Sequence, residues 1–440
     1  MNEWIKTTLA EIADIRVSNV DKKSYQGERA VMLCNYMDVY SNDYITRDIS
    51  FMEATANIME IAKFTVSKGD VLITKDSETP FDIGIPAVVE EDIDNLICGY
   101  HLAQLRPDEN KVDSVFLAKK LAMPDVASYF SRVAAGSTRY GLSNGAIANT
   151  IISIPPLKKQ KKISHVLKCL DSTLARTEEL IKKYQQIKVG MMHDLFTRGI
   201  DADGKLRPHR NLSPGLYQKT SNGWFPKDWQ FSRLGDALLR IDSGWSPACY
   251  ETPPGIGEWG VLKVSAVTKG YYDFSESKTL PMNLKPIPSI EVKNEDVIMT
   301  RANGVAELVG KCVQVWQTQD KLMLSDKLLR LVPNDYMLKG FLYHLMCSND
   351  IVKQIVKAMS GSSGQRNISQ SEIKNFLCPI PSIDEQHMIS NILLAYDKLI
   401  EREKIALAKM KKYKHGLMQD LLTGKVAVRV KLKNTEASHV

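Results

Sequence analysis

The sequence lacks several features that would assign it to a familiar class. No apolar run approaches the ~18 residues that a membrane span requires, and residues 1–15 show no basic segment followed by an apolar block. The seven cysteines lie far apart, and no two form a Cys-x-x-Cys pair. This spacing disfavours zinc sites and disulfide frameworks. We therefore expect a cytoplasmic protein with reduced thiols, no metal and no membrane segment.

Motifs of DNA-modifying enzymes are also missing. Neither the Asn/Asp-Pro-Pro-Tyr/Phe motif nor the glycine-rich cofactor loop of amino-methyltransferases occurs. Residues 304–312 approach a phosphate-binding loop, but the glycine spacing is one residue too long and Cys312 replaces the hydroxyl that binds Mg²⁺. The acids in 107–111 are adjacent in a polar turn and are not spread over neighbouring strands as in a nuclease. We therefore predict no catalytic site in this chain.

The remaining composition is that of a globular protein. The 440 residues allow two or three domains, with 44% hydrophobic and 25% charged residues. The net charge is +7, and residues 156–198 alone carry ten Lys/Arg against four Asp/Glu. This balance is compatible with a polyanionic partner, although an excess of charge along a helix is more often a solvated face.

An internal repeat runs through most of the chain. Segment 66–75 (VSKGDVLITK) matches segment 292–301 (VKNEDVIMTR) at an offset of 226. Further matches at offsets of 225–226 pair Trp4 with Trp229, Leu9 with Leu234, 116–125 with 341–350, and 134–143 with 359–369. The chain is therefore one module written twice.

Each module ends in a long helical pattern with a one-sided apolar seam in 4-3-4-3 spacing. Polar interruptions fall at corresponding places, among them Lys188 and Lys414. Each helix is about 58 Å long at 1.5 Å per residue and needs a partner, for which its own copy is the obvious choice. The seam residues are Ile163, Leu167, Leu170, Leu174, Ile181, Tyr184, Met191 and Leu195 in the first helix and Ile389, Leu393, Tyr396, Ile400, Leu407, Met410, Leu417 and Leu421 in the second.

The expected fold is α+β, with two tandem α+β domains, each followed by a long helix, and the two helices paired as an antiparallel coiled coil. Prolines before each helix, Ser382 spaced from Glu385 as in a capping box, and glycines 199 and 424 mark the helix boundaries. The expected order is domain 1 (1–155), first helix (156–198), surface linker (199–228), domain 2 (229–381), second helix (382–424) and basic tail (425–440).

These features resemble the specificity (S) subunits of type I restriction-modification systems, over roughly residues 4–425. The most specific elements are 226–229 (PKDW) and 381–386 (PSIDEQ). The resemblance implies two target recognition domains, each reading one half of a bipartite, asymmetric site in double-stranded DNA. It implies that the helices set the half-site spacing and dock two methyltransferase subunits, and through them restriction subunits, for phage defence. S-adenosylmethionine, ATP and Mg²⁺ would be bound by those partners. The first helix departs from the family pattern, because lysines 158, 159, 161 and 162 surround its glutamine.

Candidate DNA contacts are polar residues in matched loops of the two domains. Arg and Lys can bond guanine bidentately, and Asn and Gln adenine, but any one such residue is more often an ordinary exposed loop residue. The candidates are Lys75, Arg139 and Tyr140 in domain 1 and Arg301, Asn303, Gln365, Arg366 and Asn367 in domain 2, with Lys263, Ser265, Asn35 and Tyr36 as weaker ones.

Two alternatives are a stand-alone DNA-binding protein and a coiled-coil scaffold without a methyltransferase partner. Against a scaffold, each β-rich block of ~150 residues is larger than a capping structure requires. Against a simple regulator, no helix-turn-helix pattern is evident.

Overall fold

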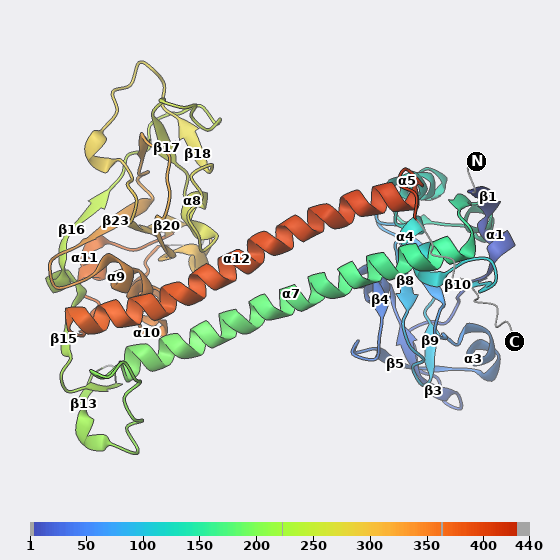
Figure 1. Cartoon of the computed structure of the whole chain (residues 1–440), viewed down its shortest axis with the longest axis horizontal. Coiled ribbons are helices and arrows are strands. Elements are labelled where there is room, and N and C mark those ends of the chain that lie inside the picture. The colour runs from blue at the N-terminus through green and yellow to red at the C-terminus, as the bar shows by residue number, and fades with distance from the viewer. Residues whose placement is uncertain (1–3, 222, 362–363, 429–440) are drawn as a thin grey trace, which may run out of the picture. The chain divides into compact units, whose positions relative to one another are not determined.

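The computed structural model describes residues 4–221, 223–361 and 364–428, so most of the expected basic tail lies outside the described residues. The chain forms two compact units. Unit 1 comprises the segments Met1–Glu178 and Ile405–Val440, and unit 2 comprises Glu179–Lys404. Each unit therefore contains one globular domain and half of each long helix (Figure 1). No helix among the described residues is long and apolar enough to cross a membrane.

A five-stranded sheet in the order β2-β10-β6-β8-β4 forms the centre of unit 1. Neighbours are antiparallel except β4 and β8, and the central strands are buried apolar runs. A three-stranded sheet, β5-β3-β9, packs beside it. The strands are β2 (Ala13–Val17), β10 (Leu102–Pro107), β6 (Val71–Thr74), β8 (Pro86–Val89), β4 (Tyr44–Ile45), β5 (Met52–Ala56), β3 (Arg29–Cys34) and β9 (Leu96–Cys98).

Short helices and two-stranded ladders complete unit 1. Strand β1 (Ile5–Thr8) pairs with β12 (Ile151–Ile154), and β7 (Asp76–Ser77) pairs with β11 (Tyr140–Gly141). The helices are α1 (Leu9–Ile12), α2 (Tyr36–Tyr40), α3 (Ile58–Phe64), α4 (Ser114–Leu121), α5 (Pro124–Val133) and α6 (Asn144–Ala148).

Unit 2 repeats this arrangement, which confirms the duplication. Its main sheet has the order β16-β23-β19-β21 and its second sheet the order β18-β17-β22. The ladders β15-β25 and β20-β24 correspond to β1-β12 and β7-β11 of unit 1. Strand β19 begins 226 residues after β6, and α9 begins 225 residues after α4. The elements are β15 (Gln230–Arg233), η2 (Leu234–Ala237), β16 (Leu238–Ser243), β17 (Gly260–Leu262), α8 (Ser265–Thr268), β18 (Ser277–Thr279), η3 (Pro288–Ile290), β19 (Val297–Thr300), β20 (Ala302–Asn303), η4 (Ala306–Leu308), β21 (Cys312–Gln314), β22 (Leu322–Met323), β23 (Leu328–Pro333), α9 (Lys339–Met346), α10 (Asn349–Ala358), β24 (Arg366–Asn367), α11 (Gln370–Lys374) and β25 (Leu377–Ile380).

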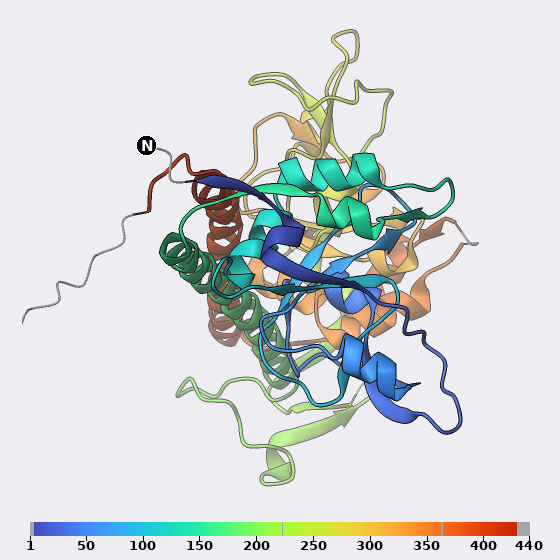
Figure 2. The ribbon, with the colours of Figure 1, turned by 90° about the vertical axis from the view of Figure 1, so that its right-hand side faces the viewer.

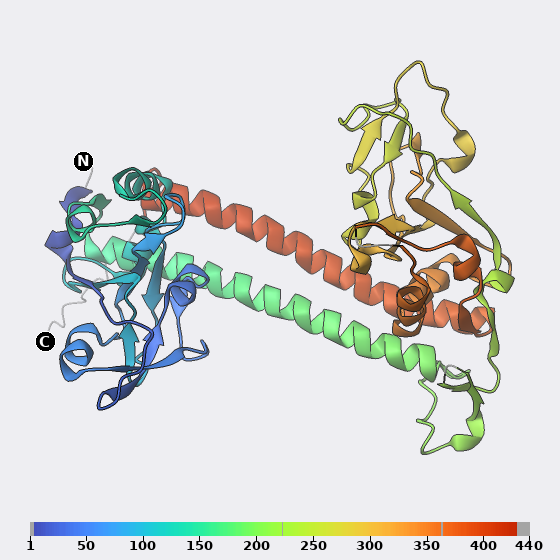
Figure 3. The same cartoon turned by 180° about the vertical axis from the view of Figure 1, so that it is seen from behind.

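The long helices are α7 (Leu157–Thr197) and α12 (Ile383–Leu422), and they pair antiparallel as predicted. The early turns of α7 and the last turns of α12 lie side by side in unit 1 (Figure 2). In unit 2, α9 lies between the strands and α12 (Figures 1 and 3). Helices α4 and α9 connect the sheets to the long helices in two continuous apolar cores.

The predicted seam residues are buried or half-buried, with one exception. The exception is Leu417, of which 36% is exposed. Near its end α12 meets the core of unit 1 through Met418, Leu421 and Leu422, which moves the packed face away from Leu417.

The two lysines that interrupt the seam, Lys188 and Lys414, form ion pairs between the helices. In unit 1, Lys414 Nζ of α12 lies 2.7 Å from Asp171 Oδ1 of α7. In unit 2, Lys188 of α7 pairs with Asp397 of α12. Asp171 and Asp397 are 226 residues apart, as are Lys188 and Lys414, so the two pairs are copies of one contact.

The glutamine shared by both helix starts is a structural residue. Gln160 Oε1 accepts a hydrogen bond from the backbone N–H of Asp113 (2.9 Å), and its amide donates to the carbonyls of Lys111 (3.0 Å) and Pro155 (2.8 Å). Gln386 makes the corresponding bonds to residues 338, 336 and 381. Each glutamine is fully buried and ties the loop before α4 or α9 to the start of a long helix.

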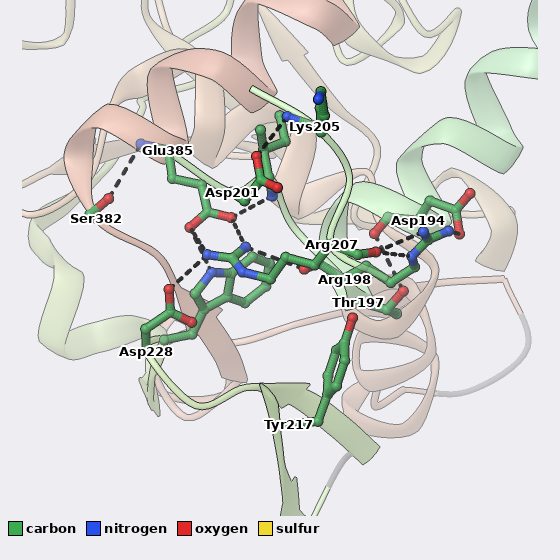
Figure 4. Close-up of polar contacts among 12 residues, drawn as sticks. Asp194, Thr197, Arg198, Asp201, Lys205, Arg207, Tyr217, Asp228, Ser382 and Glu385 are labelled. Atoms are coloured by element: carbon green, nitrogen blue, oxygen red, sulfur yellow. Dashed lines mark hydrogen bonds and ion pairs between the residues drawn. The ribbon is translucent and has the colours of Figure 1, made fainter. Parts of the chain in front are cut away.

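The segment 199–228 is more than the expected surface linker. It contains η1 (Pro214–Leu216) and the hairpin β13 (Tyr217–Thr220)–β14 (Gly223–Pro226). Arg207 is buried, and its guanidinium donates to both carboxylate oxygens of Glu385, at 2.5 and 3.0 Å (Figure 4).

Glu385 is therefore more than the capping residue that its spacing predicted. Its carboxylate also accepts hydrogen bonds from Trp229 Nε1 (2.9 Å) and the Ile200 N–H (2.7 Å). Ser382 Oγ accepts from the Glu385 N–H at 3.4 Å, but the Glu385 side chain does not return to Ser382, because Arg207 and Trp229 occupy it. The linker, α12 and the start of domain 2 thus meet at one carboxylate.

Candidate nucleic-acid interface

Matched loops bring the main candidate residues together in each unit. Lys75 directly follows β6, and its carbonyl accepts a hydrogen bond from the Leu142 N–H (2.9 Å), which places it beside β11. Arg301 directly follows β19, and its carbonyl accepts from the Ile368 N–H (3.0 Å) beside β24. In unit 1 the ladder pairs Tyr140 with Ser77. In unit 2 it pairs Asn303 with Arg366 and Ala302 with Asn367. The repeat thus builds the same frame twice.

A tight glycine turn shapes both loops. Gly136 has φ +146°, and a Cβ there would lie 1.9 Å from the Arg139 carbonyl oxygen. Gly361 has φ +111°, and a Cβ there would lie 2.2 Å from the Gln365 carbonyl oxygen. Only glycine accepts this backbone without strain. The two turns therefore hold Arg139 and Gln365 at corresponding places.

Cluster 1, the group in unit 1, is a chain of polar side chains in contact. Lys75 Nζ donates to Asp76 Oδ2 at 2.8 Å, and His101 Nδ1 lies 2.9 Å from the same oxygen. Arg139 Nη2 lies 2.8 Å from His101 Nε2 and 3.1 Å from His101 Nδ1, so the guanidinium rests against the imidazole. Cluster 1 comprises Lys75, Asp76, His101, Arg139 and Tyr140.

The titration of cluster 1 follows from these contacts. Burial alone would raise the pKa of Asp76, but the hydrogen bonds and charges of Lys75 and His101 outweigh it and lower that pKa. Burial lowers the pKa of His101, and the charge of Arg139 lowers it further, against the raising effect of Asp76. His101 is 8% exposed, whereas Arg139 is exposed to solvent. Cluster 1 therefore presents one outward guanidinium on a neutral imidazole.

In cluster 2, the group in unit 2, the positive charges are not paired with carboxylates of the described chain. Among the described residues, no carboxylate forms an ion pair with Arg301, Lys327 or Arg366. The Asn303 side-chain oxygen accepts from the Val305 N–H (3.0 Å), and that of Asn367 accepts from Ser360 Oγ (3.1 Å). Cluster 2 comprises Arg301, Asn303, Lys327, Gln365, Arg366 and Asn367.

The weaker candidates have local partners. Lys263 Nζ lies 3.7 Å from Glu251 Oε2, and Ser265 Oγ donates to Glu276 Oε2 (2.8 Å), so both engage carboxylates of unit 2. The Asn35 N–H donates to Asp38 Oδ2 (2.7 Å) at the start of α2. Tyr36 differs, because its hydroxyl donates to the Asp82 carbonyl (3.1 Å) in the loop that follows β7. Of these four, Tyr36 is the one placed against the cluster 1 loops.

Sequence reasoning missed His101 and Lys327. His101 directly precedes β10, the neighbour of β6, and its carbonyl accepts a hydrogen bond from the Lys75 N–H (2.8 Å). Lys327 directly precedes β23, the neighbour of β19, and its carbonyl accepts from the Arg301 N–H (2.8 Å). The two residues are 226 positions apart, so the repeat offset was the signal that could have found them. It was not followed because neither lies in a glycine-rich loop.

Comparison with known proteins identifies a family for the whole arrangement. The family model described as "Type I restriction modification DNA specificity domain" matches residues 1–188 and 226–410. The putative type I restriction enzyme MjaX specificity subunit of Methanocaldococcus jannaschii is 25% identical over 376 residues, covering 84% of this chain and 81% of that protein. The type I restriction enzyme EcoEI specificity subunit of Escherichia coli is 32% identical over 237 residues, covering 52% of this chain and 37% of that protein.

A solved structure shows the same fold. The S subunit of a type I restriction-modification system from M. genitalium superposes with a TM-score of 0.58 at 15% identity, over 95% of this chain and 96% of that one. This superposition covers both copies of the module, and each of the two matches to the family model covers one copy.

Proposed function

Because the chain belongs to the type I restriction-modification DNA specificity family, we propose that it reads a bipartite, asymmetric site in double-stranded DNA, one half-site per domain. The observation that carries this proposal is the pair of matched clusters. The same backbone frame presents Lys75, Asp76 and Arg139 in unit 1 but Arg301, Ala302 and Gln365 in unit 2. Identical half-sites would need identical readers, and these two differ at every one of those positions.

The chemistry of both clusters suits DNA. An arginine can bond guanine bidentately, and glutamine or asparagine can bond adenine, each good contact discriminating by ~1–3 kcal/mol. Cationic side chains also contact phosphates, which positions a reader without adding sequence information. The three cations without ion pairs in cluster 2 support both roles. Two readers with a few contacts each then sum to a useful specificity.

The long helices serve as the spacer and the docking platform in this proposal. Helix α7 starts in unit 1 and ends in unit 2, and α12 runs the opposite way, so their lengths determine the half-site spacing. Exposed lysines 158, 161 and 162 at the start of α7 are available to partners. Two methyltransferase subunits dock on the helices, and restriction subunits join through them. The assembly works in the cytoplasm, where its DNA is.

The chain is a non-catalytic subunit in this proposal. The described residues hold no group of three or more His, Cys, Asp and Glu side chains placed to bind a metal. S-adenosylmethionine, ATP and Mg²⁺ are bound by the partner subunits, which carry out methylation and cleavage. The specificity subunit directs that chemistry to a sequence.

The test is to sequence the modified bases of a host genome with and without this gene, with its methyltransferase partner present in both strains. A split, asymmetric motif that depends on the gene is expected. Absence of any gene-dependent motif would leave a stand-alone DNA-binding protein or a scaffold. Exchange of residues 1–155 for those of another family member should then change one half of the motif, and insertion of a whole heptad into each helix should change the spacing.

A further inference from the structure

We propose that His101 is a positioning residue of the unit 1 reader: its neutral imidazole holds Arg139 in place for DNA, and protonation of the imidazole releases it. This inference rests on the proposed function. It adds that one half-site is read in a pH-dependent manner and the other is not.

The contacts of the three side chains require a neutral His101. A carboxylate only accepts hydrogen bonds, and Asp76 Oδ2 is 2.9 Å from Nδ1, so Nδ1 carries the proton. Arg139 Nη2 lies 2.8 Å from Nε2 and 3.1 Å from Nδ1, so the guanidinium lies against the face of the ring. A neutral aromatic ring attracts a cation placed there. A second proton, on Nε2, would set two cations in contact.

The groups that face His101 together favour its neutral form. They are Lys75 at the end of β6, Asp76 of β7, Arg139 of the loop before β11, and the ring of Tyr100, whose centroid lies 3.5 Å from that of His101. Burial, Arg139 and Lys75 all lower the pKa of His101, and Asp76 alone raises it, with a net lowering. His101 is therefore neutral at neutral pH and takes up its proton as the pH falls below the ordinary histidine value.

Unit 2 provides an internal control. Lys327 occupies the place of His101, Gln365 that of Arg139 and Ala302 that of Asp76. None of these three changes its charge near neutral pH. The unit 2 frame also shows that this position accepts a lysine, so His101→Lys should fold.

The experiment uses the full chain assembled with its methyltransferase partner. DNA affinity is measured from about pH 8 to about pH 4.5, a range that extends well below the ordinary histidine pKa because that of His101 is lowered. Three duplexes are compared: the motif found in the genomic experiment, and the same motif with either half-site scrambled. The proteins are the wild type, His101→Gln, His101→Lys and Arg139→Gln, with the exposed His209→Gln as matched control.

Discrimination at the unit 1 half-site should fall as the pH is lowered in the wild type and in His209→Gln. It should be independent of pH in His101→Gln. It should be lower at every pH in His101→Lys and Arg139→Gln, by about tenfold, the order expected for one good contact to a base. Discrimination at the unit 2 half-site should be unchanged in all variants.

Two results would overturn the inference. One is full discrimination by His101→Lys, and the other is a wild-type pH dependence in His101→Gln. A wild type that discriminates at neither half-site would instead overturn the proposed function. A readout without DNA is the histidine NMR titration of the chain, in which Arg139→Gln should raise the pKa of His101. An unchanged pKa would show that the contact does not form in solution and would also overturn the inference.

Discussion

Lys75 and Arg301 stand at the same place in two copies of one fold, but their surroundings differ. Lys75 is bonded to Asp76 at 2.8 Å in a chain of paired charges, whereas Arg301 has no carboxylate partner among the described residues. The backbone frame, with its glycine turn and two-stranded ladder, is common to both. The two copies therefore present a side chain at the same place on the backbone, but the residues that contact that side chain differ between them.

The helix pair shows a similar inequality. Asp171 in unit 1 lies 2.7 Å from both Lys119 and Lys414 and accepts a hydrogen bond from the Tyr44 hydroxyl (2.8 Å). Asp397 in unit 2 pairs with Lys188, and its second oxygen lies 3.9 Å from His344 Nε2. The same contact is thus built into a network in one copy and left as a single pair in the other.

Removing these carboxylates should have the largest effect on stability, and the loss should be larger for Asp171 in unit 1 than for Asp397 in unit 2. Asp171→Ala leaves Lys119 buried with only Asp43, whose side chain is 55% exposed, so we expect a loss of ~3–5 kcal/mol. Asp397→Ala leaves one lysine that is nearer to solvent, with an expected loss of ~1–3 kcal/mol. Urea unfolding measures both. Equal losses would show that the additional partners of Asp171 contribute nothing.

Acid should destabilise unit 2 through His344, whose place in unit 1 is taken by Lys119. Burial and the charge of Lys188 lower the pKa of His344 to about 3. Between that value and the ordinary histidine pKa of about 6.5, the unfolded chain binds a proton that the folded chain does not. Stability is therefore lost as the pH falls through this interval. In His344→Phe the slope of unfolding free energy against pH should decrease by about one proton, and an unchanged slope would contradict the assignment.

The glycine turns should be equally sensitive in both copies. Gly136→Ala and Gly361→Ala each place a methyl group against a carbonyl oxygen, and we expect each to cost ~1–3 kcal/mol. Gly204→Ala is the control, because Gly204 has φ +78° but no atom within 4 Å of an added Cβ. Thermal unfolding of the three variants measures the difference. A control as destabilised as the other two would mean that backbone strain alone, without the clash, explains the effect.

The smallest effect is expected at the edge of the seam. Leu417→Ala removes a partly exposed side chain and should cost ~1 kcal/mol or less. Leu167, on the same predicted stripe, is fully buried, and its replacement by Ala should cost ~2–5 kcal/mol. Similar losses at the two sites would show that Leu417 is packed as tightly as Leu167.

Periodic features of this chain, such as the long helices and the buried strands, could be predicted from sequence. Which side chains contact one another could not. Helices α7 and α12 lie within the expected ranges 156–198 and 382–424, because a heptad stripe and flanking prolines and glycines act locally. The buried strands at 71–74 and 297–300 coincide with apolar runs in the matched segments 66–75 and 292–301. The candidate residues Lys75 and Arg139 were found, but their link through His101 was not, because it joins segments that only the folded sheet brings together.

The linker shows the same limit. Arg207 lies in a polar segment without periodicity, and nothing near it in sequence marks it as buried. Its partners, Asp228 and Glu385, are 21 and 178 positions away. A charged residue in such a segment is exposed more often than not, so the prediction of a surface linker followed the general rule and failed at this residue.

The carboxylate of Glu385 has a consequence for genetic exchange. It joins the end of α7, the linker, the entry to domain 2 and the start of α12 through Ile200, Arg207 and Trp229. Figure 4 shows its contact with Arg207. A recombination event with one breakpoint between residues 207 and 385 brings together an arginine and a carboxylate from different parents. Such a hybrid keeps the junction only if both parents carry the same pair. Hybrids that acquire a new second reader therefore need a matching pair at this junction as well as a new set of DNA contacts.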